Sequence, residues 1–297
     1  MIQTTVKISG MACSMCEAHI NDTIRRAFSV EKVSSSHTKG ETVILSHEPL
    51  NEAALRAAEE KGVKLAICSG RPAGDTSMFA VTHGFDRMAI LSMNGGYCLD
   101  RPFGTPYADY AIERDTAMQC FQWFRERNMT FACFMQNEIA AFAGEAAAED
   151  IYWCAPWNDP RAPRILKGEE AVRRFTEGRV NKFVCIERDR EQLQALGRRL
   201  ETLPGLEITS SWADNYELMP QGVSKGRAVK ELAEKMGIGP DQVMTVGDFD
   251  NDLSMIEYAG YGTAMGNATP KVKAAAKYVT LTNDEDGVAA AIRKYVL

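Results

Sequence analysis

The sequence has no long hydrophobic run and no excess of basic residues. Its apolar stretches, such as 63–68 and 243–247, are far shorter than the ~20 residues that a membrane helix needs. With 34 Lys and Arg against 40 Asp and Glu, the net charge is -6, and no basic stretch offsets the repulsion from nucleic acid or an anionic membrane. The first ten residues lack the basic-then-apolar pattern of a signal peptide. We therefore expect a cytoplasmic protein with neither nucleic acid nor a membrane as partner.

The composition is that of a globular protein. The chain has 297 residues, of which 45% are hydrophobic and 25% charged, enough for two or three domains. Among the eight cysteines, Cys68, Cys133 and Cys185 sit singly in apolar runs, which predicts buried thiols. Cys13 and Cys16 differ, because they form a CxxC pair after a glycine.

The first 66 residues show their own pattern of strands and helices. The periodicity predicts the order strand, helix, strand, strand, helix over residues 4–9, 16–27, 30–38, 41–46 and 51–61, followed by a further strand that begins at Val63. This order predicts a small ferredoxin-like α+β domain over residues 1–66, which could share its last hairpin and helix with the domain that follows.

The GMACSMC sequence falls between the first predicted strand and helix. Two thiols at a helix N-terminus favour the thiolate form, and thiolates select a soft ion, Cu(I) first and Zn(II) if a further ligand is present. At residues 3 to 66 the chain resembles the heavy-metal-associated domain, whose signature is GMxCxxC. The resemblance implies that Cys13 and Cys16 bind metal and exchange it with a partner protein. A redox pair and a pair without function remain alternatives, and Met11 is more typical of loop packing than of a ligand.

The rest of the chain contains apolar strands that end in polar loops. The runs at 63–68, 88–93 and 243–247 lead into SGRP, NGGY and GDFDND. Strands with continuous apolar character are typical of a parallel sheet buried on both faces, and such sheets carry their chemistry at the carboxyl ends of the strands.

A lysine and two aspartates complete this pattern. Lys225 begins a predicted amphipathic helix, and an ammonium beside free helix N–H groups favours phosphate. Asp248 and Asp252 supply the hard oxygen ligands that suit Mg²⁺, with water and substrate phosphate as further ligands.

In this order, SGRP, NGG, GVSKG, GDFDND and AMGNA resemble the Cof-type branch of the haloacid-dehalogenase-like phosphatases over residues ~50 to 297. The resemblance implies an α/β fold: a doubly wound, mostly parallel, Rossmann-like core with a C2-type α/β cap. The core would comprise residues 67–97 and 221–297, and the cap residues 98–220. Trp153, Trp157 and Trp212 could line a substrate face, although buried cap core is the favoured reading.

The resemblance also implies roles for the matching residues. Ser69 would bond the phosphoryl oxygen, Lys225 would neutralise the phosphate, and Asp248 would bind Mg²⁺. Asn251 and Asp252 would support the metal and phosphate. Arg71 and Asn94 would lie at the mouth of a site for a small phosphorylated molecule.

The family's nucleophile and general acid are not found. They are the two aspartates of a DxDGT sequence after the first core strand, and this chain has no such sequence. If strand 41–46 doubles as that core strand, Ser46 and Glu48 take the two positions, whereas the family's usual spacing points to Ser35 and His37. Neither alignment supplies a carboxylate nucleophile.

Two questions follow from this missing sequence. One is whether strand 41–46 joins the core sheet, which we slightly favour, or stays in the small domain and leaves the core without its central strand. The other is function: a Mg²⁺-dependent phosphomonoesterase with a substitute nucleophile, or an inactive pseudophosphatase that binds phosphorylated ligand or metal.

Overall fold

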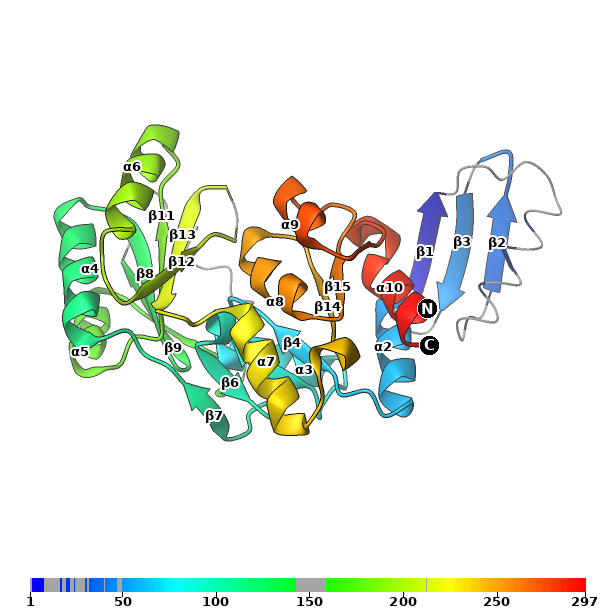
Figure 1. The fold of residues 1–297 in the computed structure, drawn as a ribbon, viewed down its shortest axis with the longest axis horizontal. Helices are drawn as coiled ribbons and strands as arrows, with labels where there is room; N and C mark the ends of the chain where they lie inside the picture. The colour runs from blue at the N-terminus through cyan, green and yellow to red at the C-terminus, as the bar shows by residue number, and fades with distance from the viewer. Residues whose placement is uncertain are drawn as a thin grey trace.

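The computed structural model has a small N-terminal sheet, a core of two separate sheets, and a cap (Figure 1). It describes residues 2–7, 17, 20, 21, 24, 30, 32–39, 41–46, 50–142, 159–211 and 213–297. None of the helices within these ranges has the length and apolar character that spanning a membrane requires.

The N-terminal sheet has three antiparallel strands in the order β1-β3-β2, with bounds Ile2–Lys7, Glu41–Ser46 and Lys32–Ser36. Val33 and Ile44 are buried in its small core, and Ile24 packs on them. Figure 1 shows this sheet at one end of the molecule, beyond the C-terminal helix. Because β3 pairs with β1 and β2, the favoured hypothesis that residues 41–46 form the central core strand is wrong.

The helix after this sheet belongs with the core. Helix α2 (Leu50–Glu60) packs on the C-terminal helix α10 (Gly287–Tyr295) through small and aliphatic side chains: Ala54, Ala58, Ala289 and Ile292. The strand expected from Val63 forms only at β4 (Ala66–Cys68), where it pairs with β5. A complete ferredoxin-like domain is therefore not confirmed, because its second helix and fourth strand contribute to the core.

The core contains two half-sheets rather than one. The first has the order β4-β5-β6-β7, in which β5 is parallel to β4, with bounds Ala66–Cys68, Ala89–Ser92, Tyr97–Leu99 and Pro106–Asp109. The second has three parallel strands in the order β14-β15-β16, with bounds Met244–Gly247, Tyr261–Ala264 and Tyr278–Val279. Within the described ranges, no strand pairs with both β4 and β14.

Helices hold the two half-sheets together. Helix α3 (Ala73–Thr82) covers the first half-sheet, and α8 (Leu253–Tyr258) and α9 (Pro270–Ala275) cover the second. Helix α7 (Lys225–Met236) contacts both: Ala228 packs on Leu91 of β5, while Gly226 lies against Ser254 of α8. The pair α2 and α10 forms the second bridge.

The cap is a six-stranded sheet with helices on one face. Its order is β10-β9-β8-β11-β13-β12, with bounds Arg164–Leu166, Glu138–Phe142, Thr130–Met135, Lys182–Ile186, Asn215–Pro220 and Leu206–Thr209. The helices are α4 (Arg114–Glu126), α5 (Gly168–Glu177) and α6 (Arg190–Leu200). Alternation along β8 sends Phe131 toward these helices and Phe134 toward Met93 of the core. The predicted α/β cap architecture is present, and the hairpin β6–β7 extends the core sheet beyond residue 97.

Candidate active site

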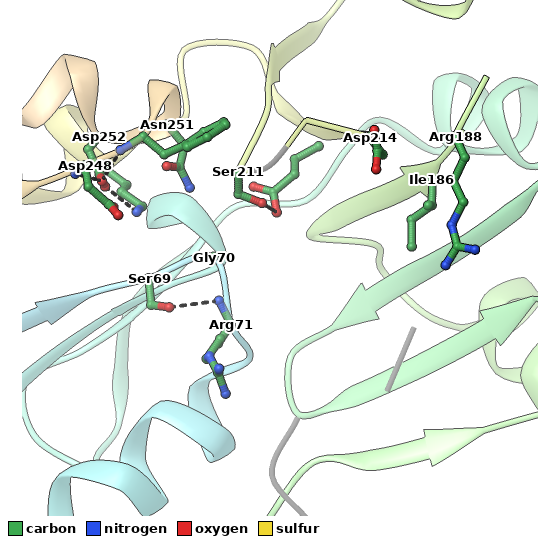
Figure 2. A pocket seen from close by; sticks show the side chains of 13 residues that line it. Ser69, Gly70, Arg71, Ile186, Arg188, Ser211, Asp214, Asp248, Asn251 and Asp252 are labelled. Carbon is green, nitrogen blue, oxygen red and sulfur yellow. Dashed lines mark hydrogen bonds and ion pairs between the residues drawn. The ribbon is translucent and has the colours of Figure 1, made fainter. Parts of the chain in front are cut away.

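A cavity of about 640 Å³ lies between the core and the cap. The three residues on which the sequence prediction depended, Ser69, Lys225 and Asp248, all line it. Figure 2 shows core side chains on one side of this pocket and Ile186, Arg188 and Asp214 of the cap on the other. The full lining consists of Ser69, Gly70, Arg71, Ile186, Arg188, Ser211, Asp214, Glu217, Lys225, Asp248, Phe249, Asn251 and Asp252.

Lys225 is the buried cation of the pocket. It is the first residue of α7, whose N-cap Ser224 accepts a hydrogen bond from the backbone N–H of Arg227. Its Nζ lies 2.5 Å from Oδ1 of Asp252, and Lys225 is only 7% exposed. Burial lowers the pKa of Lys225, but the charge and hydrogen bond of Asp252 together with the charges of Cys68 and Glu217 outweigh burial, so the pKa is raised and the ammonium persists.

The loop after β14 presents Asp248 and Asp252 in different ways. Both oxygens of Asp252 are engaged, because Oδ2 accepts the backbone N–H groups of Asp248 and Phe249 at 2.9 and 3.2 Å. A Cβ on Gly247 would lie 2.5 Å from Cβ of Asp252, so this close turn requires glycine.

The carboxylate of Asp248 is held more loosely. Its Oδ2 accepts a hydrogen bond of 3.2 Å from the side chain of Asn267. Burial, and then the charge of Asp252, raise the pKa of Asp248 above its ordinary value. A nearby cation would relieve this cost, because opposite charge favours the ionised carboxyl.

The loop after β4 forms the floor beside Lys225. Ser69 donates its backbone N–H to Leu91 at 2.8 Å, and its hydroxyl accepts the backbone N–H of Arg71 at 3.2 Å. Arg71 is ion-paired with Asp75 at 2.8 Å and is half exposed. Cys68, just before this loop, is not a reactive thiol, because burial raises its pKa to about 12.

A buried ion pair of the cap contacts the loop after β4. Lys182 of β11 and Glu217 of β13 lie 2.9 Å apart and are almost completely buried. The Lys182 ammonium also donates to the carbonyl oxygen of Gly70 at 2.7 Å. Burial raises the pKa of Glu217, but the charge of Lys182 and hydrogen bonds from Asn94, Lys182 and Ser211 outweigh it, so the pKa is lowered.

Asn94 extends this network to Asn251 in the loop after β14. Its side-chain amide donates to Glu217 at 2.5 Å, and its oxygen accepts from Asn251 at 3.3 Å. Asn94 has a φ of +55°, a left-handed conformation that asparagine tolerates better than most residues. The predicted residues Asn94 and Asn251 therefore meet, although Asn94 is buried rather than at the mouth.

Sequence reasoning missed the cap residues of the pocket. Glu217 and its partner Lys182, which is not part of the lining, carried a usable signal, since each directly precedes an apolar run of its strand and buried charges are paired. Arg188, Ser211 and Asp214 gave no such signal, because they follow or precede strands in ordinary polar segments.

The described residues offer few protein ligands to a metal ion. No group of three or more His, Cys, Asp or Glu side chains within these ranges is arranged around a common point. Mg²⁺ nevertheless needs only one or two carboxylates when water and substrate phosphate complete its shell. Asp248 fits that role, whereas both oxygens of Asp252 already accept hydrogen bonds.

Several predicted residues lie outside the described ranges. These are Met11, Cys13, Cys16, Glu48, Trp153, Trp157 and Trp212. Ser35, one candidate for the nucleophile position, lies on β2, where its hydroxyl contacts Asn21 and Thr42. His37 follows the same strand and contacts Glu17.

A mixed α/β core with a lysine–aspartate pocket beneath an inserted cap defines the class of protein, a core-and-cap α/β fold. The family model described as haloacid dehalogenase-like hydrolase matches residues 45–292, and the chain belongs to this family. The resemblance stated from the sequence motifs is thereby confirmed for the core and cap.

Relatives and solved structures agree with this assignment. The phosphatase YwpJ of Bacillus subtilis is 31% identical over 258 residues, which cover 80% of this chain and 90% of the relative. The 5-amino-6-(5-phospho-D-ribitylamino)uracil phosphatase YcsE of Bacillus subtilis is 50% identical over 251 residues, covering 83% and 88%. The structure of a haloacid dehalogenase-like hydrolase from B. subtilis superposes with a TM-score of 0.72 at 28% identity, covering 84% of this chain and 93% of that one.

Replacing Glu217 by Gln should reduce the free energy of unfolding by about 3–5 kcal/mol at neutral pH, because Lys182 would remain buried without its counter-charge. Since the pKa of Glu217 is lowered in the folded state, its contribution is present above the unfolded pKa and is lost as the pH falls through the folded pKa. The difference between wild type and variant should therefore shrink in acid. Urea titrations at several pH values measure it.

The matched control for this experiment is Glu191→Gln, which changes an exposed glutamate on α6 of the same cap and should leave stability nearly unchanged. Equal stability of Glu217→Gln and wild type at neutral pH would contradict the stabilising role of the buried pair.

Proposed function

We propose that this protein binds a small phosphorylated metabolite together with Mg²⁺ in the pocket between core and cap. The observation that carries the proposal is the juxtaposition of the buried Lys225 ammonium, the N-terminus of α7 and the Asp248 carboxylate in one cavity. A cavity of about 640 Å³ has the size of a small-molecule site. The relatives YwpJ and YcsE are phosphatases, which supports a phosphorylated ligand.

The pocket residues can be assigned separate roles in binding the phosphate, the Mg²⁺ ion and the rest of the ligand. Lys225 supplies positive charge to the phosphoryl oxygens, and Asp252 fixes that ammonium in place. The Ser69 hydroxyl can turn to donate to a phosphoryl oxygen. Asp248 would hold Mg²⁺, which supplies charge neutralisation of the phosphate when bound. Arg188 and Asp214 line the cap side of the pocket and would face the part of the ligand beyond the phosphate.

Hydrolysis is the second candidate, and the similarity to phosphatases favours it. The chemistry requires a nucleophile and an acid for the leaving group. Of the described carboxylates that line the pocket, Asp252 and Glu217 are held by lysines, Asp248 is the proposed Mg²⁺ ligand, and Asp214 lies on the cap side, away from Lys225 and Asp248. The carboxylate pair of DxDGT is not in the sequence. Binding without turnover is thus the function that this geometry supports best.

Loss of the cation should weaken phosphate binding. In Lys225→Met/Asp252→Asn, which removes both charges and so leaves no buried unpaired ion, affinity for inorganic phosphate with MgCl₂ should fall about tenfold to a hundredfold. Isothermal titration measures this. Lys230→Ala, which removes an exposed lysine from the same helix, is the matched control and should bind as wild type does. Unchanged affinity in the double variant would overturn the assignment of Lys225.

A turnover assay distinguishes ligand binding alone from phosphate ester hydrolysis. With 4-nitrophenyl phosphate and Mg²⁺, the binding proposal predicts no hydrolysis above the buffer rate, while the compound competes with phosphate for the pocket. Release of 4-nitrophenol is followed by absorbance. Activity that survives repurification and disappears in Asp248→Ala would establish the enzyme and overturn the proposal of binding alone.

We also propose, from the GMxCxxC sequence alone, that Cys13 and Cys16 bind a soft ion such as Cu(I). Titration against a Cu(I) chelator should show one equivalent bound by wild type and none by Cys13→Ser. Cys133→Ser, which changes a thiol buried in the cap, is the control and should keep the full equivalent. Binding that persists in Cys13→Ser would refute this proposal.

A further inference from the structure

The turn after β5 has an unusual backbone conformation. Met93 and Asn94 have φ values of +52° and +55°, and Gly95 follows with +94°. Glycine adopts left-handed backbone freely and asparagine tolerates it, but methionine rarely does. Both Met93 and Asn94 are also almost completely buried. Such a conformation persists only where surrounding contacts hold it, and it is concentrated at functional sites.

The side chain of Asn94 joins the cap to the loop after β14. Its nitrogen donates to Oε2 of Glu217 at 2.5 Å, and its oxygen accepts from Nδ2 of Asn251 at 3.3 Å. The ionised carboxylate of Glu217 can only accept, so it fixes which end of the amide faces the cap. Glu217 belongs to β13, whereas Asn251 lies in the loop that carries Asp248. One side chain therefore contacts both a cap strand and the loop of the proposed Mg²⁺ ligand.

The backbone of the same turn contacts the two other core segments of the pocket. The N–H of Asn94 donates to the carbonyl oxygen of Ser69 at 3.0 Å. Gly95 packs on the start of α7, since a Cβ there would lie 2.6 Å from the carbonyl oxygen of Ser224. The next residue of α7 is Lys225, the buried cation of the pocket. The turn therefore contacts each of the three core segments that carry the proposed phosphate and Mg²⁺ site.

Gly70 of the pocket floor rests directly on this network. A Cβ on Gly70 would lie 3.2 Å from Oδ1 of Asn94, and it would lie 3.1 Å from Nζ of Lys182 and 3.4 Å from Oε1 of Glu217. Gly70, Glu217 and Asn251 are among the described residues that line the pocket, and Asn94 is buried behind them. Asn94 therefore supports the wall of the pocket from the protein side.

We propose that Asn94 is a positioning residue for the phosphate and Mg²⁺ site. It holds the loop after β4, the start of α7 and the loop after β14 in one arrangement, and Glu217 of the cap anchors it. This role rests on the proposed binding of phosphate and Mg²⁺, and Asn94 acts through Ser69, Lys225 and Asp248 rather than on the ligand. A contact between cap and core thus sets the affinity of a site built from core residues.

The variant Asn94→Gly tests this role, because glycine keeps the left-handed backbone and removes both side-chain hydrogen bonds. Affinity for inorganic phosphate with MgCl₂, measured by isothermal titration, should fall about tenfold to a hundredfold, as it does when residues that orient metal ligands are lost. The matched control is Asn128→Gly, which changes an exposed asparagine of the cap with a φ of +50° and should bind as wild type does. Equal affinity of Asn94→Gly and wild type would overturn the positioning role.

A second readout needs no ligand. In ligand-free Asn94→Gly, ¹⁵N relaxation dispersion should show new millisecond exchange at residues 69–71 and 248–252, because the two loops lose their common contact. Wild type and Asn128→Gly should lack this exchange. Identical dispersion in all three proteins would overturn the proposal. Failure of wild type to bind phosphate would instead refute the proposed function, and the dispersion data would still decide the role of Asn94.

Exchanging the two side-chain types provides a rescue experiment. Asn94→Asp alone places two carboxylates against each other, and Glu217→Gln alone leaves Lys182 buried without its counter-charge. In Asn94→Asp/Glu217→Gln, the new amide can donate to the new carboxylate, which still accepts from Asn251. The double variant should bind phosphate at least about fivefold more tightly than either single variant. Affinity no better than that of the weaker single variant would contradict the proposed contact.

Discussion

The ion pair between Lys225 and Asp252 is the interaction on which this structure depends. It joins the two half-sheets, because α7 packs on β5 through Ala228 while Asp252 belongs to the loop after β14. Two glycines make the approach possible. A Cβ on Gly226 would lie 2.3 Å from the carbonyl oxygen of Ser254, and one on Gly247 would collide with Asp252. Burying two charges is costly, and the cost is offset only when geometry and hydrogen bonds are good, as they are for Asp252.

The second buried pair explains how the cap and the core present one pocket. Lys182 and Glu217 come from adjacent cap strands, yet their partners Gly70 and Asn94 come from core loops. The contact from Asn94 to Asn251 then reaches the loop that carries Asp248. The ligand would therefore meet a surface whose parts are fixed relative to one another, which is the condition for selective recognition of a small molecule.

Much of the core could be predicted, because its signals are local. Apolar strands ending in polar loops predicted that Ser69 and Asp248 would meet, and a helix start predicted Lys225 beside them; all three line one pocket, although Ser69 and Asp248 follow strands of two separate sheets. The cap pair could not be assigned a partner, since Lys182 and Glu217 are brought together by sheet pairing across the cap. The expected strand 41–46 did form, but its choice of partners depends on tertiary packing, and it paired with β1 and β2 instead of the core.

The central claim is that Lys225, Ser69 and Asp248 form one site for phosphate and Mg²⁺. The most direct measurement is a ¹H–¹⁵N NMR titration of the full chain with inorganic phosphate and MgCl₂. The account predicts that amide shifts concentrate at Ser69, Gly70, Gly226 and Asp248, the backbone around the pocket. Shifts confined to other surfaces, or no shifts at saturating phosphate, would contradict it.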